Sequence, residues 1–357
     1  MGSSFLIVGG GIVGHVIAWK ICHAYPDAAV TLLERDMVGA GATCRSAGLH
    51  FPLGRTAAVR SMSQSSETFY RSFCEARPDA PIVPLGLRVH ASESGASGFE
   101  SFFTDGAGLA PDPEERNVSD ALGSHHRIWR AHGAQRADVA ALTRYMSKLL
   151  DARLRSYSGI KVVRIVEEES TVRVLTNDGL TFEANAVILA PGPWALAPEF
   201  QPFTESLGIR TKRVVAFHID GRATAELQQD SVVDLFIEED AFLMPRADGR
   251  GRLFSFTRQH WDVSPDDASG DIDAEDRAEA VGVLTNVAPR FSGSIRGGQA
   301  FCDAYSPTRA PIVANVGQSG RVIFAGAANG SGYRLAPAIA HDVLMTFEAG
   351  RTREING

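Results

Sequence analysis

The stretch Phe5-Leu6-Ile7-Val8-Gly9-Gly10-Gly11-Ile12-Val13-Gly14 decides how this chain begins to fold. A short apolar run followed at once by glycines is typical of a strand that turns tightly into a helix. The alternating apolar pattern continues to Ile21, and a second apolar run from Val30 to Leu33 ends in Glu34. This acid stands about 20 residues after the last glycine, as in the strand–turn–helix–strand unit that binds dinucleotides.

Each residue of this unit has its own expected role. Gly9 permits the tight turn, Gly11 lets the backbone approach a pyrophosphate, and Gly14 lets the helix pack closely on the strand. The start of the helix offers free N–H groups and a positive dipole end to phosphates. Glu34 can accept both hydroxyls of an adenosine ribose and would repel a 2′-phosphate, which disfavours NADP. The predicted contacts are Gly9, Gly11, Ile12, Val13, Gly14 and Glu34.

A segment rich in small residues runs from Arg35 to Gly48, directly after the ribose acid. Small side chains let the backbone lie against a flat ligand, and hydroxyl groups can bond phosphate or ring atoms. We therefore expect further ligand contacts here, from Arg35, Ala42, Thr43, Arg45, Ser46, Ala47 and Gly48.

The composition is that of a globular protein with a sizeable core, with 357 residues of which 44% are hydrophobic. The net charge of −7 argues against a nucleic-acid footprint or a basic membrane patch. The four cysteines are scattered, so we expect neither a disulfide framework nor a metal site, and a cytoplasmic location. The sequence contains no apolar run long enough for a transmembrane helix, and we expect no membrane span.

The end of the chain repeats the features of a nucleotide-binding unit. Val322 to Ala325 reads as a buried strand, followed by a glycine-rich loop from Gly326 to Gly332 and a helix from about Leu335 to Ala349. The first and last segments are therefore expected to fold together. Between them we expect helices at 55–73, 137–155 and 276–287, strands at 85–90, 161–166, 171–175, 180–182 and 186–190, and further strands at 214–220, 233–237 and 252–257.

Motifs along almost the whole chain resemble one flavoenzyme family. They are Leu6 to Gly14, Leu33-Glu34-Arg35 with Gly41-Ala42-Thr43 and Ser46-Ala47-Gly48, Val187 to Trp194, Met244-Pro245-Arg246 with Asp248-Gly249, Ser306-Pro307 with Pro311-Ile312, and Gly330 to Pro337. In their order and spacing the chain resembles the D-amino-acid-oxidase-like FAD enzymes, the group with glycine oxidase and monomeric sarcosine oxidase. The resemblance implies an α/β fold, a Rossmann-like FAD-binding domain with an inserted antiparallel-sheet substrate domain.

The same resemblance implies domain limits and a cofactor. We expect a discontinuous FAD-binding domain at 1–78, 137–208 and 309–357, and a substrate domain at 79–136 and 209–308. FAD is expected rather than NAD, because a flavin ring must also be gripped at the end remote from the adenosine, where the second glycine loop lies. We expect non-covalent FAD, since Cys302 lies one position from the covalent attachment site of sarcosine oxidase. The further contacts implied are Val163, Ala190, Gly192, Trp194, Gly330, Gly332, Tyr333, Arg334 and Leu335.

Three residues are candidates for contact with the substrate. Arg334 stands where the sarcosine-oxidase branch places a carboxylate-binding lysine, and the fork of an arginine matches a carboxylate. Asp303 replaces the carboxylate-binding arginine of D-amino-acid and glycine oxidases, so it contacts either a substrate ammonium or a neighbouring arginine. His50 follows the segment expected beside the flavin and faces the ring or the substrate, or else is structural.

These residues favour oxidation of the C–N bond of an amino acid or secondary amine by hydride transfer to flavin N5, with hydrolysis of the imine and reoxidation by O₂. A dehydrogenase that uses another acceptor stays open, because the strand at 252–257 lacks the lysine by which sarcosine oxidase speeds reaction with O₂. One alternative is oxidation of a 2-hydroxy acid with a non-oxygen acceptor, with His50 or His218 as base. Another is a flavin-binding subunit without turnover of its own.

Overall fold

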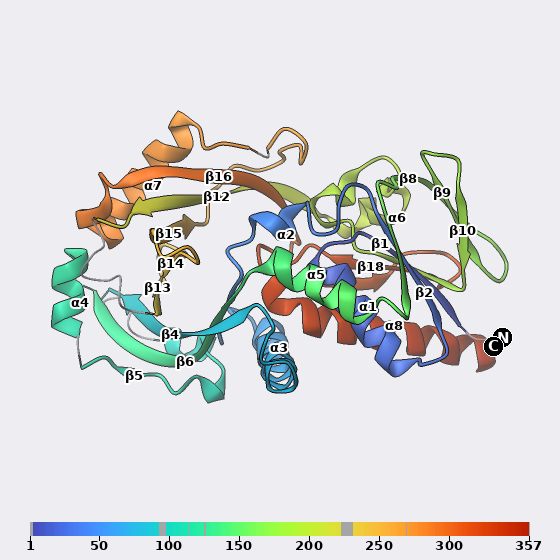
Figure 1. Ribbon diagram of the computed structural model, residues 1–357, viewed down its shortest axis with the longest axis horizontal. Helices are drawn as coiled ribbons and strands as arrows, with labels where there is room; N and C mark the ends of the chain where they lie inside the picture. The colour runs from blue at the N-terminus through green and yellow to red at the C-terminus, as the bar shows by residue number, and fades with distance from the viewer. Residues whose placement is uncertain are drawn as a thin grey trace.

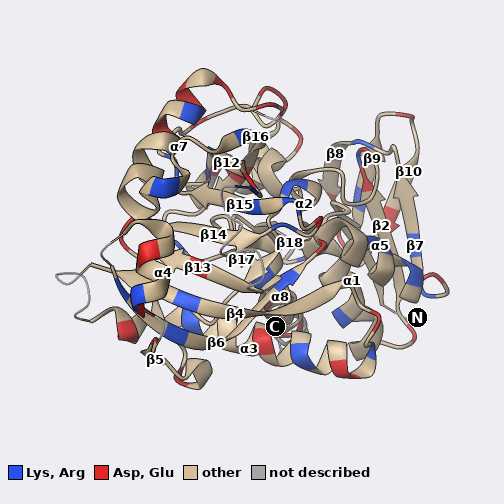
Figure 2. Ribbon diagram, turned by 60° about the vertical axis from the view of Figure 1, so that its left-hand side comes forward, with Lys and Arg blue, Asp and Glu red and all other residues tan. Residues whose placement is uncertain are grey.

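The computed structural model describes residues 3–92, 98–113, 115–124, 126–222, 231–268 and 270–356. Figure 1 shows two parts arranged along the long axis, with the two ends of the chain together at one extremity. In the view of Figure 2, basic and acidic segments are scattered over both parts. None of the helices in these residues is long and apolar enough to cross a bilayer.

A six-stranded sheet joins the first and last segments of the chain. Its order is β17 (Ile312–Asn315), β18 (Val322–Gly326), β11 (Ala186–Leu189), β1 (Ser4–Val8), β2 (Ala29–Glu34) and β7 (Leu154–Ser158). All neighbouring pairs are parallel except β17 with β18. The expectation that the two ends fold together is confirmed, because β18 lies beside β11 and β11 beside β1.

Both faces of this sheet are covered, which explains why β1 is an uninterrupted apolar run. Phe5 and Ile7 pack on one face, in a core shared with α1 (Ile12–Ala24), α3 (Ala57–Ala76), α5 (Val139–Leu149) and α8 (Gly332–Asn356). Leu6 and Val8 face the opposite core, which a three-stranded sheet completes. That sheet is the expected β-meander, with the order β10 (Thr181–Ala184), β9 (Val172–Thr176) and β8 (Val162–Glu167).

The second part is built on a larger sheet. Its order is β16 (Ile295–Tyr305), β12 (Arg210–Asp220), β15 (Gly251–Phe256), β14 (Ala241–Pro245), β13 (Val232–Phe236), β4 (Ile82–Ala91), β6 (Arg127–Ala137) and β3 (Leu49–His50), with β5 (Ala110–Pro111) on β6. The pairs are antiparallel except β13 with β4. The helices α4 (Glu115–Leu122) and α7 (Ala274–Val287) contribute to one apolar core with it. The remaining helices of the described residues are short: α2 (Ala42–Arg45), α6 (Gln201–Thr204) and several 3₁₀ helices.

Several expected elements differ from the structure in extent. The helix expected at 137–155 ends at Leu149, and Leu154–Ser158 instead adds a parallel strand to β2. Strands β6, β14 and β16 were not expected from the pattern. The predicted domain limits stay a prediction; β3 falls inside the segment assigned to FAD binding but pairs with β6 of the larger sheet.

Candidate functional site

A cavity of about 1380 Å³ lies between the two parts and is lined from both. It runs past the first glycine turn, the segment after β2 and the glycine loop before α8. The residues expected to bind the cofactor that line it are Gly9, Gly11, Ile12, Val13, Glu34, Arg35, Ala42, Thr43, Arg45, Ser46, Ala47, Gly48, Ala190, Gly192, Trp194, Gly330, Gly332, Tyr333, Arg334 and Leu335. The structure thus brings together residues from 9–48, 190–194 and 330–335, which are far apart in the sequence.

Gly14 does not line the cavity, and its surroundings match the packing role expected for it. A Cβ atom at Gly14 would lie 2.0 Å from the carbonyl oxygen of Gly9. Gly9 itself has φ of 114°, and a Cβ atom there would lie 2.1 Å from the carbonyl oxygen of Ala190. Both positions therefore exclude any side chain, which brings α1, β1 and β11 close together beneath the cavity.

Glu34 and Thr43 hold the backbone at the nucleotide end. Glu34 Oε2 accepts the Gly10 N–H at 2.7 Å, and its Oε1 accepts the Asp36 N–H at 2.9 Å. Burial raises the pKa of Glu34, and the two amides oppose that rise. Thr43 Oγ1 accepts the N–H of Ile12 at 3.0 Å at the start of α1, whose N-cap residue Gly11 offers no side chain. Each carboxylate oxygen keeps a second lone pair for a hydroxyl group of a ligand.

The side chain of Val163 does not reach the cavity. It is exposed, whereas its neighbour Val162 is buried and lines the cavity. Successive side chains of a strand point to opposite faces, so Val163 turns outward when Val162 turns inward. A cofactor contact at Val163 stays a prediction, and only its backbone could make it.

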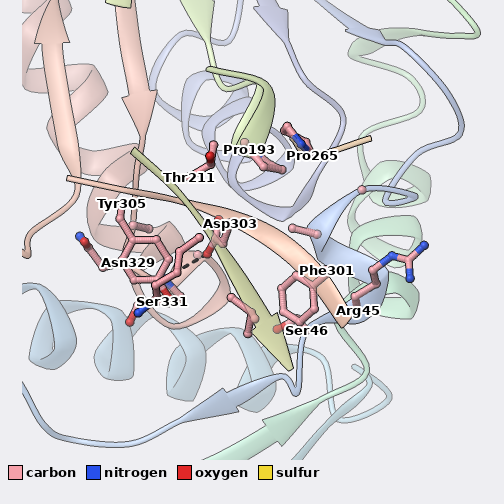
Figure 3. A pocket seen from close by; sticks show the side chains of 18 of the residues that line it. Arg45, Ser46, Pro193, Thr211, Pro265, Phe301, Asp303, Tyr305, Asn329 and Ser331 are labelled. Atoms are coloured by element: carbon pink, nitrogen blue, oxygen red, sulfur yellow. Dashed lines mark hydrogen bonds between the residues drawn. The ribbon is translucent and has the colours of Figure 1, made fainter. Parts of the chain in front are cut away.

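Asp303 ties the strand β16 to the C-terminal glycine loop (Figure 3). Its Oδ1 accepts the N–H of Ala304 at 2.8 Å and its Oδ2 accepts the N–H of Gly330 at 3.0 Å. Burial raises the pKa of Asp303 to about 6, and these amides and the charge of Lys212 oppose the rise. Among the described residues no arginine pairs with Asp303, which the sequence had left open; the carboxylate positions the backbone instead.

Arg334 is a buried cation in the first turn of α8. One Nη donates to the carbonyl oxygen of Leu53 and the other to Ser331 Oγ at 3.0 Å, and the guanidinium lies 4.7 Å from the centre of the Phe51 ring. Burial lowers its pKa to about 10, while the charge of Asp240 raises it. Two of the five N–H donors of a guanidinium thus have partners, and the group lines the cavity.

His50 does not face the cavity, so the structure does not support a catalytic role for it. Successive side chains of a strand point to opposite faces, and it is Leu49 of β3 that lines the cavity. His50 is fully buried near Tyr70, and burial together with the charge of Arg334 lowers its pKa to about 3. His218, on β12, does not line the cavity either.

The same alternation turns Cys302 away from the cavity. On β16 it is Phe301, Asp303 and Tyr305 that line the cavity, whereas Cys302 is buried, and burial raises its pKa to about 12. This orientation supports the expectation of non-covalent FAD, since a thiol on the far face of the strand cannot reach the ring.

Sequence reasoning missed several charged residues of the cavity wall, among them Lys212 and Asp240. Lys212 of β12 lies opposite Asp303 in the register with β16, and its Nζ is 4.2 Å from the centre of the Tyr305 ring and 4.8 Å from that of Trp261. Burial lowers the pKa of Lys212 to about 8. Asp240 lies between β13 and β14. Lys212 lies before the strand expected at 214–220, and its partners on other strands gave no sequence signal.

A contact between the two parts closes over the nucleotide end. Asp266 accepts the N–H of Trp194 at 2.9 Å and lies 3.3 Å from Nη1 of Arg35, whose guanidinium stacks 4.0 Å from the Trp194 ring. All three residues line the cavity. In Figure 3 the side chain of Arg45, which also lines the cavity, points away from Asp303.

The structure also gathers His126, Glu238 and Glu239, whose potential ligand atoms lie within 4.8 Å of one another. His126 lies more than a hundred positions before the two adjacent glutamates, and the sequence gave no sign of the grouping. The expectation of no metal stays a prediction.

The geometry fits FAD. The cavity is continuous from the first glycine turn to the N-terminal end of α8, and at the turn there is room for backbone but not for side chains. A pyrophosphate bound at the N-terminal end of α1 would place the adjoining ribose next to Glu34, at the end of β2. The positive end of α8 faces the far end of the cavity, where it favours negative charge.

Known proteins share this architecture. Glycine oxidase from Geobacillus kaustophilus is 24% identical over 209 residues, so the match covers 53% of this chain and about half, 54%, of that protein. Its crystal structure superposes with a TM-score of 0.78 at 16% identity, over 97% of this chain and 95% of that one. L-proline dehydrogenase from P. horikoshii gives 0.79 at 16% identity, over 98% and 94%. L-α-glycerophosphate oxidase from Mycoplasma pneumoniae, with FAD bound, gives 0.79 at 13% identity, over 97% and 94%.

The structural neighbours at these identities establish the fold. The family follows from a separate match, in which the model of the FAD dependent oxidoreductases (DAO) covers residues 4–344. With the nucleotide turn, the ribose acid and the C-terminal loop around one cavity, the chain belongs to the DAO family of FAD-dependent oxidoreductases.

Proposed function

We propose that this oxidoreductase acts on the C–N bond of a small amine or amino acid that carries a carboxylate. The observation that carries the proposal is Arg334, a buried guanidinium on the cavity wall at the end remote from Glu34. Among the described residues, no carboxylate forms an ion pair with it. A buried cation without a paired anion is costly, so an anionic group of the substrate is its natural partner.

The chain's own residues bind and orient in this reaction. FAD, when bound, supplies the two-electron acceptor. Arg334 fixes the substrate carboxylate, Asp303 holds the loop at Gly330 in place, and the first turn of α8 favours negative charge nearby. Removal of a hydride from the carbon next to nitrogen, with release of a proton from nitrogen to solvent, gives an imine, which water hydrolyses to a carbonyl compound and either ammonia or an amine. We propose O₂ as the electron acceptor, with hydrogen peroxide as its product.

The two alternatives gain nothing from the site. Oxidation of a 2-hydroxy acid needs a base for the hydroxyl proton, and neither His50 nor His218 lines the cavity. The reading as a subunit without turnover rested on the reversed charge at Asp303. That carboxylate accepts hydrogen bonds from the backbone of Ala304 and Gly330, so it does not argue against turnover.

The test is anaerobic mixing of the FAD-loaded protein with D-amino acids, N-methyl amino acids and 2-hydroxy acids. We expect bleaching of the flavin absorbance by at least one amine that carries a carboxylate. With that amine, Arg334→Leu should raise KM about 10- to 100-fold, because hydrogen bonds to charged groups contribute about 1.5–3 kcal/mol.

The matched variant Arg334→Lys keeps the charge and should restore part of the affinity. An unchanged KM in Arg334→Leu would remove Arg334 from the site. Bleaching by hydroxy acids alone would replace the proposal with the 2-hydroxy-acid alternative, and bleaching by chemical reductants alone would favour the subunit without turnover.

A further inference from the structure

Asp240 stands at the turn between β13 and β14, on the wall of the cavity. We propose that its carboxylate binds the positively charged nitrogen of the substrate, so that the cavity recognises a zwitterion. The inference rests on the proposed function, in which Arg334 holds the carboxylate of the same molecule. The role is one of binding and orientation, and it requires no proton transfer by Asp240.

Asp303 and Asp240, two of the acids that line the cavity, differ in the hydrogen bonds that their oxygens already accept. Both oxygens of Asp303 accept backbone N–H groups, from Ala304 and Gly330. Oδ2 of Asp240 accepts the hydroxyl of Thr257 at 2.6 Å, whereas its Oδ1 lies 3.6 Å from Arg55, too far for a hydrogen bond. The Asp240 side chain is 59% exposed and belongs to the cavity wall, so this oxygen can accept from a ligand.

A short chain of contacts connects Asp240 to Arg334. Arg334 donates to the carbonyl oxygen of Leu53, two positions before Arg55 in the sequence. Arg55 donates to the carbonyl oxygen of Ile237 at 2.8 Å and approaches Asp240. The charge of Asp240 also acts on Arg334, whose pKa it raises against the effect of burial. A cation subsite and an anion subsite therefore lie on one stretch of wall, as an amino acid requires.

Two other cations share the surroundings of Asp240. Arg55 is the closer and is half-exposed, and Lys212 feels the charges of both Asp240 and Asp303. The ammonium of Lys212 lies over the rings of Tyr305 and Trp261. Arg55 forms an ion pair with Oδ1 of Asp240 at 3.6 Å, but neither Arg55 nor Lys212 donates a hydrogen bond to that oxygen in the described part of the chain, so Oδ1 can still accept one from a ligand.

The backbone of Asp240 is in the left-handed region, with φ of 48°. Of the five non-glycine residues with positive φ in the described ranges, four line the cavity: Asp240, Asp262, Arg309 and Asn329. Uncommon backbone conformations that gather at one cavity point to a functional site. The plain alternative is a turn residue that caps Thr257. Asparagine would serve that purpose as well, because it tolerates the same conformation and keeps an acceptor oxygen.

The test therefore compares Asp240→Asn with the control Asp262→Asn. Asp262 shares the left-handed backbone and the cavity wall but is hydrogen-bonded to Arg210 through both oxygens. The probes are trimethylglycine and 3,3-dimethylbutanoate, carboxylates of the same shape that differ by one positive charge. Trimethylglycine has no lone pair on nitrogen and cannot form an imine, so calorimetric titration of the FAD-loaded protein measures binding without turnover.

We expect the wild type and Asp262→Asn to prefer trimethylglycine about tenfold, the effect of Coulombic attraction between one close pair of opposite charges near the protein surface. Asp240→Asn should lose that preference and bind 3,3-dimethylbutanoate at least as well as the wild type. Equal binding of both probes by the wild type would overturn the role of Asp240 alone. A preference that survives in Asp240→Asn would do the same. If the wild type binds neither carboxylate, the anion site at Arg334 fails and the inference fails with it.

Discussion

At the nucleotide end of the cavity, backbone groups form the wall: the turn around Gly9 and Gly11, and amides that Glu34 and Thr43 hold in place. At the opposite end the wall includes charged side chains, among them Arg334 and Lys212. The first end fits the nucleotide part of FAD, the cofactor of the family. The second end is adjusted by side chains, which can change without rebuilding the backbone.

The comparison predicts the largest effect for a methyl group placed under the nucleotide turn. Gly14→Ala sets a Cβ atom against the Gly9 carbonyl oxygen inside α1, where nothing flexible can move aside. We expect a loss of about 3 kcal/mol or more in the free energy of unfolding, together with loss of bound FAD. Urea unfolding and the flavin absorbance of the purified protein measure both.

The matched control is Gly282→Ala, also inside a helix, α7, with no atom within 4 Å of the added Cβ. It should be neutral or stabilising by up to about 1 kcal/mol, because alanine favours helices more than glycine does. Equal changes in the free energy of unfolding and in bound FAD for Gly14→Ala and Gly282→Ala would contradict the view that tight backbone packing forms the nucleotide end.

Sequence alone predicts this end well because its information is local. The glycines, the two strands and Glu34 lie within the first 34 residues, and their spacing reflects the contacts that they make. Val163 shows the limit of such reasoning: the side chain that lines the cavity is that of its neighbour Val162. Which face of a strand turns inward depends on what the strand packs against, and a short apolar run alone does not reveal it.

The substrate end was predicted less well because its residues meet only in three dimensions. The strand β16 contains Gly297 and Gly298 and escaped prediction, so the pairing of Lys212 with Asp303 could not be foreseen. The family position of Arg334 identified one cation of the wall, but the family offered no position for Asp240. The sequence showed the negative charge at Asp303, but it did not show that the N–H groups of Ala304 and Gly330 donate hydrogen bonds to this carboxylate.

The buried charge of Asp303 should make stability depend on pH. Its pKa in the folded protein is about 6, above the ordinary aspartate value of 3.8, so the unfolded chain loses the proton at lower pH. The contribution to stability is complete below pH about 4 and is lost as pH rises towards about 6. We expect the wild type to lose about 1–2 kcal/mol relative to Asp303→Asn over this range, after allowance for screening by water in the cavity.

Urea unfolding at several pH values between 4 and 8 measures this difference. Asp262→Asn is again the control, with the opposite sign: its hydrogen bonds to Arg210 lower the pKa of Asp262, so the wild type should lose its advantage as pH falls. If the free energy of unfolding changed with pH in the same way in the wild type and in Asp303→Asn, the buried charge of Asp303 would not destabilise the fold.

The smallest effect is expected where the two ends meet, at Asp266. Its carboxylate accepts the N–H of Trp194 and faces Arg35. In this ion pair the side chain of Arg35 is 32% exposed and that of Asp266 is 68% exposed, so the pair contributes about 0–1 kcal/mol to stability. Asp266→Ala should raise the dissociation constant of FAD roughly two- to fivefold, and Asp266→Asn, which keeps an oxygen for Trp194, should raise it less. Fluorescence titration of the FAD-free protein measures these constants, with the neighbour Asp267→Ala as control, since Asp267 does not line the cavity. If Asp266→Ala instead abolished FAD binding, side-chain contacts from the second part would hold the nucleotide as firmly as the backbone turn does, and the contrast between the two ends would fail.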